Sequence, residues 1–275
     1  LLKDWSPDNS DREYGYNVSL KYGLANSMNT ITSWVMKQFG PQEAVKMARD
    51  LGITSDLPPV PSLALGVADV SVYEMVGAFG TFANKGVYTK PQFLARIENK
   101  EGEVIVEYIP ESREALSEEN AYVMLKLMEG VTSYNYNKDL KKNTAGTGIR
   151  LRFPKSEQRP YAGISYPIAG KTGTTQNNSD GWFIGITPDL VTGVWVGAED
   201  RSVRFDRTAL GQGANTALPM WGYYMNKIYA DSTLQISKEE FEKPENPLSI
   251  ELDCENYGTP TDFGTGTGGG VNWDK

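Results

Sequence analysis

The heptapeptide Ala169-Gly170-Lys171-Thr172-Gly173-Thr174-Thr175 joins a mostly apolar run, residues 161–168, to a polar turn at 176–180. Apolar runs return at 182–186 and at 190–198. Short β-rich runs that are separated by Asn, Asp, Gly and Pro-Asp turns are typical of neighbouring antiparallel strands. The heptapeptide is therefore predicted to lie in a three-strand antiparallel region.

A strand that carries Lys-Thr-Gly-Thr presents a cation, two hydroxyls and one residue without a side chain. Gly173 would let a ligand lie close to the backbone, where a Cβ would block it. Lys171, Thr172 and Thr174 could then hold a carboxylate through charge and hydroxyl donors. Taken alone, so short a pattern also fits a surface turn that happens to contain these residue types.

A second motif, Ser27-Met28-Asn29, lies far upstream of the lysine. Apolar residues recur at helical spacing through residues 20–39, and Met28 belongs to that series. The pattern predicts one helix, with Ser27 and Asn29 directed away from its buried line. A helix N-cap or a buried polar contact is the alternative role for both side chains.

Ser-x-Asn and Lys-Thr-Gly are two of the three motifs with which penicillin-binding proteins and class A β-lactamases carry out serine acyl transfer. The chain resembles the transpeptidase domain of bifunctional, class A penicillin-binding proteins from about Trp5 to about Tyr229. Besides the two motifs, the segments that carry the resemblance are 5–9, 61–66, 82–86, 182–185, 187–197 and 219–221.

The resemblance implies an α+β protein with the penicilloyl-serine transferase fold, in which a five-stranded antiparallel sheet packs with helices beside an all-helical subregion. Residues 1–230 would form the C-terminal part of the transpeptidase domain. Residues 231–275 become acidic and then rich in Gly and Thr, and we expect them to form a flexible tail, or one draped over the surface.

Within this fold the resemblance also assigns catalytic roles. Ser27 would relay a proton to the departing D-Ala nitrogen, and Asn29 would orient the catalytic lysine and the substrate amide. Lys171 would supply the positive potential that keeps that base deprotonated and attracts the terminal carboxylate. The Thr174 N–H would form half of an oxyanion hole.

The same strand supplies the substrate-binding residues. The hydroxyls of Thr172 and Thr174 would bind the terminal carboxylate of the substrate, with Gly173 and Thr175 beside them. The implied partners are peptidoglycan stem peptides that end in D-Ala-D-Ala, and the β-lactams that mimic them. No cofactor and no metal is expected.

The family's nucleophile lies in a Ser-x-x-Lys motif, and no serine of this sequence has Lys three positions later. Ser33 has Lys37 at four positions, which is the wrong spacing. We therefore expect the nucleophile to precede Leu1, in an upstream part of the same protein. The 275-residue chain is then expected to be inactive alone.

Composition excludes several other classes of protein. The absence of histidine rules out Ser-His-Asp and Cys-His catalysis and His-ligated zinc. A net charge of −8 argues against a nucleic-acid partner. Cys254, the single cysteine, cannot form an internal disulfide. No uncharged apolar run reaches the roughly 18 residues of a membrane span. The resemblance implies an extracytoplasmic location, with an anchor in the upstream part of the protein.

Local signals predict several further elements. Ser71 and Ser117 are predicted to cap helices, and a strand hairpin is expected around residues 99–102. Residues 132–160 are polar and basic, which fits either a solvated loop or a surface for anionic glycan or a partner protein. Within them, Gly146-Thr147-Gly148 resembles a turn that the family places before its catalytic strand.

Two other functions remain open from the sequence. A serine β-lactamase or β-lactam sensor shares the motifs, but no segment between Asn29 and Lys171 resembles the loop that carries the deacylating glutamate of class A enzymes. A non-catalytic scaffold of cell-wall assembly is the other alternative. The intact Ser27, Asn29 and Lys171 weigh against such a degenerate domain.

Overall fold

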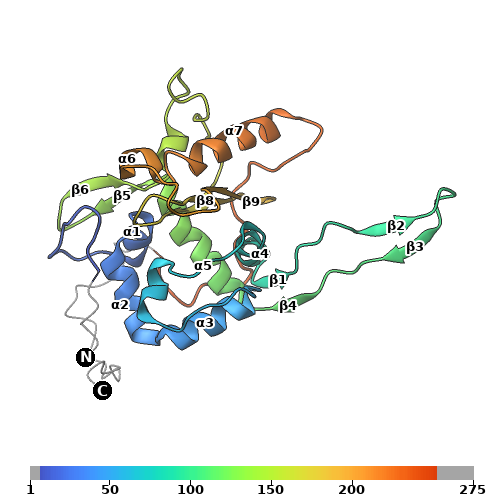
Figure 1. Cartoon of the computed structure of the whole chain (residues 1–275), viewed down its shortest axis with the longest axis horizontal. Helices are drawn as coiled ribbons and strands as arrows, with labels where there is room; N and C mark the ends of the chain where they lie inside the picture. Colours follow the sequence, from blue (N-terminus) through green and yellow to red (C-terminus); the bar gives the residue numbers. More distant parts are fainter. Residues whose placement is uncertain (1–6, 253–275) are drawn as a thin grey trace.

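The computed structural model describes residues 7–252 as helices and strands of an α+β fold (Figure 1). The helices are α1 (Leu20–Ala25), α2 (Asn29–Phe39), α3 (Pro41–Asp50), α4 (Val72–Ala83), α5 (Glu118–Met128), α6 (Thr208–Gly211) and α7 (Ala217–Ala230), with short 3-10 turns η1 (Pro61–Leu65), η2 (Glu129–Thr132) and η3 (Ile149–Arg152). The strands are β1 (Val87–Thr89), β2 (Arg96–Glu98), β3 (Val104–Glu107), β4 (Ser112–Glu114), β5 (Tyr134–Asn137), β6 (Lys142–Ala145), β7 (Ala169–Thr174), β8 (Gly181–Ile186) and β9 (Val191–Val196).

The central sheet has three antiparallel strands in the order β7-β8-β9. The heptapeptide forms β7 and the turn after it, as its residue pattern predicts. The resemblance implied five strands, and the described residues place three in this sheet. Strand β7 is an edge strand, so one side of its backbone is not paired with another strand of the described chain.

Strand β8 is covered on both faces (Figure 1). On one face Phe183 packs edge-on against Trp221 of α7, with ring centroids 5.2 Å apart, and both residues are fully buried. On the other face Ile186 packs in a cluster with Tyr122 and Leu125 of α5. Burial of both faces explains the continuous apolar run of this strand.

The all-helical subregion consists of α2, α3, η1 and α4, and its core contains Ile53, Leu57 and Ala78. Helix α4 begins where predicted: Ser71 accepts a hydrogen bond from the Glu74 N–H, and the Glu74 carboxylate bonds back to the Ser71 N–H. This capping box satisfies two backbone donors of the first turn. Ser117 caps α5 by accepting a hydrogen bond from the Asn120 N–H at 3.2 Å, so both cap predictions are confirmed.

The single helix expected over residues 20–39 is wrong, because the chain breaks between α1 and α2. Ser27 has a φ of 53°, its N–H donates to Leu24 O at 3.2 Å, and the Met28 N–H donates to Gly23 O at 2.9 Å. These two bonds form a Schellman motif, which ends a helix with one residue in the left-handed region. Glycine is usual at that position, so the serine there gave no signal of a helix end.

The hairpin expected over residues 88–98 and 103–109 is confirmed, and its second arm extends to β4 at residue 114. Strand β2 pairs with β3, and β1 pairs with β4 nearer the body of the protein. The hairpin projects away from the rest of the fold (Figure 1).

Residues 132–160 are more ordered than the solvated loop considered for them. They contain the β5–β6 hairpin and η3, and the Arg152 guanidinium lies inside, where its Nη1 donates to Ile164 O at 3.2 Å and its Nε to Thr132 O at 3.3 Å. Desolvation lowers the pKa of this arginine from its ordinary value. This residue is therefore unavailable to a glycan on the surface.

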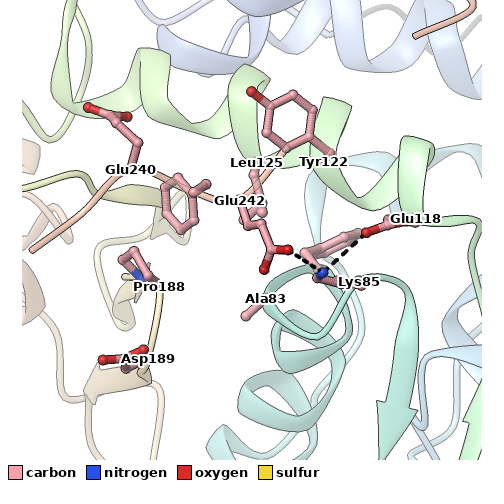
Figure 2. A pocket seen from close by; sticks show the side chains of 11 residues that line it. Ala83, Lys85, Glu118, Tyr122, Leu125, Pro188, Asp189, Glu240 and Glu242 are labelled. Atoms are coloured by element: carbon pink, nitrogen blue, oxygen red, sulfur yellow. Dashed lines mark hydrogen bonds and ion pairs between the residues drawn. The ribbon is translucent and has the colours of Figure 1, made fainter. Parts of the chain in front are cut away.

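The structure describes residues 231–252 of the segment that was expected to be flexible or draped over the surface, and one side chain of this segment reaches the core. Phe241 is 6% exposed and packs in the cluster of Tyr122, Leu125 and Ile186. It lines a cavity of about 230 Å³ between α4, α5 and the β8–β9 turn, shown in Figure 2. Lys85 lies at this cavity, paired with Glu118 at 3.4 Å and with Glu242 at 2.8 Å. Residues 253–275, the remainder of the expected tail with Cys254, lie outside the described residues.

Phe241→Ala tests whether this segment belongs to the fold. Removing a buried ring leaves a cavity, so we expect the free energy of unfolding in urea to fall by about 3 kcal/mol. Phe93→Ala is the matched control, because Phe93 is 91% exposed on the projecting hairpin, and we expect a change within about 0.5 kcal/mol. Equal effects of the two variants would show that residues 231–252 do not contribute to the core.

Candidate active site

The site is built where the two motifs meet at the open edge of the central sheet. The Lys171 ammonium donates a hydrogen bond to Ser27 Oγ, although 144 residues separate the two in sequence. It also donates to Thr172 O at 2.9 Å. Ser27 comes from the turn between α1 and α2, and Lys171 comes from the third position of β7, so the sheet and the helical part each contribute one residue.

The ammonium of Lys171 lies away from water, although the residue as a whole is only half-buried. Burial disfavours the charged form of a lysine. Desolvation lowers the pKa of Lys171 to about 8. At neutral pH this lysine is therefore mostly protonated, and a modest rise in pH can remove its charge.

Asn29 is near Ser27 but makes a different contact from the predicted one. It is the first residue of α2, and its Nδ2 donates to Asp8 O at 2.7 Å. The neighbouring Asn9 is buried, and its Oδ1 accepts from the Thr30 N–H at 3.1 Å. The segment that contains Asp8 and Asn9 thus fixes the start of α2. The predicted role of Asn29 toward a substrate stays a prediction.

The two threonine hydroxyls of β7 are held differently. Thr172 Oγ1 donates to Thr147 Oγ1 at 2.7 Å, whereas Thr174 Oγ1 accepts from the Gly213 N–H at 3.0 Å. In an antiparallel pair, alternate residues direct their backbone groups toward the partner strand. The Thr175 N–H donates to Asp180 O at 3.1 Å, so the preceding Thr174 N–H is directed away from β8, toward the open edge.

Gly173 and Thr175 stabilise the pairing of β7 with β8 and the turn between these strands. A Cβ on Gly173 would lie 3.0 Å from Cβ of Trp182, its partner across the ladder, so the position favours glycine without reference to a ligand. The Thr175 hydroxyl accepts from the backbone N–H groups of Ser179 and Asp180, both at 3.0 Å. These bonds shape the β7–β8 turn, and the substrate contacts expected of both residues remain predictions.

Thr147 was not among the site residues expected from the sequence, although its turn was noted. Besides bonding Thr172, it donates its backbone N–H to Ala25 O at 3.0 Å, in the last residue of α1. Thr147 therefore connects the helix that leads to Ser27 with the strand that carries Lys171. The Gly-Thr-Gly pattern was the available signal.

No group of three or more potential metal ligands, and no helix long and apolar enough to cross a membrane, occurs among residues 7–252. The cavity of Figure 2 lies elsewhere, since none of its lining residues belongs to either motif. The chemistry available at the site consists of one low-pKa lysine, several hydroxyls and the backbone N–H groups of an open strand edge.

The pKa of Lys171 can be measured directly. In the chain labelled with ¹³C at the lysine ε-carbon, we expect one resonance to titrate with a midpoint near pH 8, while exposed lysines titrate near about 10.4. Lys171→Met should remove that resonance and leave the others in place. A spectrum in which every lysine titrates above pH 10 would contradict the burial of this ammonium.

Comparison with known proteins relates this geometry to a family. The family model described as the penicillin binding protein transpeptidase domain matches residues 2–200. Penicillin-binding protein 1A of Aquifex aeolicus is 32% identical over 273 residues, which cover 96% of this chain and 34% of that protein. Penicillin-binding protein 1A of Clostridium acetobutylicum is 28% identical, over 84% of this chain and 26% of that protein. The chain thus spans about a third or less of these relatives.

Solved structures show the same fold. Penicillin-binding protein 1A from Haemophilus influenzae aligns with a TM-score of 0.71 and 23% identity, covering 91% of this chain and 39% of that one. PonA1 from Mycobacterium tuberculosis in complex with penicillin V aligns with a TM-score of 0.66 and 23% identity, covering 87% of this chain and 62% of that one. With the meeting of the two motifs and the match of the family model, the chain belongs to the penicillin-binding protein transpeptidase family.

Proposed function

We propose that this chain forms the C-terminal part of a peptidoglycan D,D-transpeptidase domain, which transfers the acyl group of a D-Ala-D-Ala stem peptide to an amine of a neighbouring stem. The observation that carries the proposal is the contact between Lys171 and Ser27, since it joins the two motifs in one site. The family match supports the same function. The family model ends at residue 200, and we propose that the domain continues through α7 to Ala230.

The reaction has two steps. A serine hydroxyl attacks the carbonyl of the penultimate D-Ala, an ester forms, the amide bond breaks and the terminal D-Ala leaves with a proton on its nitrogen. The amine of a second stem then attacks the ester, a new amide forms and the serine recovers its proton. Serine is a weak nucleophile and needs a neighbouring base. We propose that the serine and its base, the lysine of Ser-x-x-Lys, lie in sequence that precedes these 275 residues.

Residues of this chain are proposed to act on the leaving D-Ala and on the base that activates the nucleophile. We propose that Ser27, which already accepts a hydrogen bond from Lys171, passes a proton to the leaving nitrogen. The charge of Lys171 lowers the pKa of the neighbouring base and attracts the terminal carboxylate. Asn29 is proposed to orient that base and the substrate amide.

The edge of β7 provides the binding groups. The Thr174 N–H is directed toward the open edge, where it can stabilise the oxyanion of the tetrahedral intermediate. The hydroxyls of Thr172 and Thr174 are proposed to bind the terminal carboxylate, with Gly173 and Thr175 next to them. No step needs a cofactor or a metal ion.

Location and partners follow from the same proposal. A transpeptidase that acts on cell wall works outside the cytoplasm, so we propose an extracytoplasmic domain held by an anchor in the upstream sequence. Its substrates would be stem peptides, its inhibitors β-lactams, and its first partner the upstream part of the same protein. The net charge of −8 does not favour nucleic acid.

The location of the nucleophile is tested with a fluorescent penicillin. We expect the 275-residue chain to form no covalent adduct, and a longer protein that includes the preceding Ser-x-x-Lys to form a stable one, as judged by in-gel fluorescence after denaturation. Labelling of the 275-residue chain would show that its own residues include the nucleophile. Rapid loss of the label from the longer protein would instead indicate a β-lactamase.

The role of Lys171 is tested in that longer protein. Lys171→Ala removes the positive potential at the carboxylate and the contact to Ser27, and we expect the acylation rate to fall about 100-fold, the order of loss when one electrostatic group of such a site is deleted. Lys46→Ala, at an exposed position of α3, is the control and should leave the rate unchanged. An unchanged rate for Lys171→Ala would remove this lysine from the mechanism.

A further inference from the structure

Thr147 lies in a turn whose backbone is fixed from several directions. The Gly146 N–H donates to Ser133 O at 2.9 Å, the Thr147 N–H to Ala25 O at 3.0 Å, and the Gly148 N–H to Val131 O at 2.7 Å. Two of the acceptors lie in η2 and its C-terminal cap, and the third is the last residue of α1. The position of the threonine between them is therefore set by the surrounding backbone.

The turn also lies directly against η2. An ideal Cβ on Gly146 would be 2.2 Å from Gly130 O, so no side chain fits there. Gly146 and Gly148 are buried, whereas Thr147 between them is only half-buried. Its side chain is thus the one part of the turn that reaches the edge of the site, where its hydroxyl contacts that of Thr172 at 2.7 Å.

The direction of this hydroxyl contact has a chemical consequence. Thr172 donates its proton to Thr147, so that proton is not directed at a ligand. A carboxylate accepts hydrogen bonds and donates none. To bind one, Thr172 has to turn its proton toward the ligand, and its contact with Thr147 is kept only if Thr147 donates its own proton to the Thr172 oxygen. Without a ligand the side chain at position 147 accepts from Thr172, and with a carboxylate bound it donates to Thr172. Only a hydroxyl or another group that both accepts and donates can do both.

Thr174 needs no such partner. Its oxygen accepts from the Gly213 N–H at 3.0 Å, a bond that leaves the hydroxyl proton available for a ligand. A backbone amide thus orients one hydroxyl of β7, and a side-chain hydroxyl orients the other. The second arrangement depends on the identity of residue 147.

We infer that Thr147 is a positioning residue for the carboxylate of the substrate. It sets the direction of the Thr172 hydroxyl and reverses its own hydrogen bond when the carboxylate binds. The inference rests on the proposed function, because it requires that Thr172 and Thr174 bind a carboxylate. Thr147 itself acts through Thr172.

The test compares a penicillin with its methyl ester, which lacks the negative charge, in the protein that includes the upstream Ser-x-x-Lys. The ratio of the two second-order acylation rate constants reports recognition of the carboxylate. We expect Thr147→Val to lower this ratio about 10-fold, because a Thr172 hydroxyl that is no longer oriented would lose its hydrogen bond to the charged carboxylate. Thr147→Ser keeps the hydroxyl and should retain the ratio of the native protein.

Thr144→Val is the matched control. The Thr144 hydroxyl forms a similar pair, with Tyr22 at 2.9 Å, and lies in β6 outside the motifs. We expect its ratio to equal that of the native protein. Thr147→Ala is measured beside Thr147→Val and should show the same loss, so that the result does not depend on the fit of one side chain.

A double-mutant cycle with Thr172→Val separates positioning from a structural role. If Thr147 acts through Thr172, then Thr147→Val should change the ratio little once Thr172 is already valine. An unchanged ratio in Thr147→Val, or an equal fall for acid and ester, would overturn the inference. A native protein that acylates but does not prefer the acid would instead overturn the proposed carboxylate site.

Discussion

The rest of the structure depends on the burial of β8 on both faces. Phe183 packs against Trp221 of α7, and Ile186 packs against α5 on the opposite face. Both faces of this strand are therefore shielded from water. Two covered faces leave the strand edges as the places where polar backbone groups remain available. The edge formed by β7 is where Lys171 and the N–H of Thr174 lie. The site is thus a consequence of how the core is covered.

The helical part meets this edge through a strained turn. Ser27 adopts a left-handed conformation that is uncommon for residues other than glycine, and its hydroxyl contacts the lysine of the sheet. Local strain of this kind persists only where surrounding contacts hold it, and it often occurs at functional sites. Here the holding contacts are the end of α1 and the Thr147 turn, which bonds to Ala25.

Sequence reasoning succeeded where a signal is local. Ser71 with Glu74 predicts a helix start because the two reciprocal bonds form within one turn. Sequence reasoning failed where the polar and apolar alternation of a strand is reversed, or where a residue packs against partners distant in sequence. In β5 tyrosines are exposed while Asn135 and Asn137 are buried, the reverse of the usual alternation, so the strand was not recognised. Phe241 lies in an acidic, polar context, and its place in the core depends on residues of α5.

The residue types of this chain limited its chemistry: the absence of histidine excluded several catalytic classes, and Ser-x-Asn before Lys-Thr-Gly favoured the hydroxyl and lysine chemistry of serine acyl transfer. The tertiary structure decided which of these groups meet. The pairing of Ser27 with Lys171 spans 144 residues, and that of Thr147 with Thr172 spans 25. Neither pairing has a local pattern, because contacts so distant in sequence form only when helices and sheet bury their apolar faces against each other.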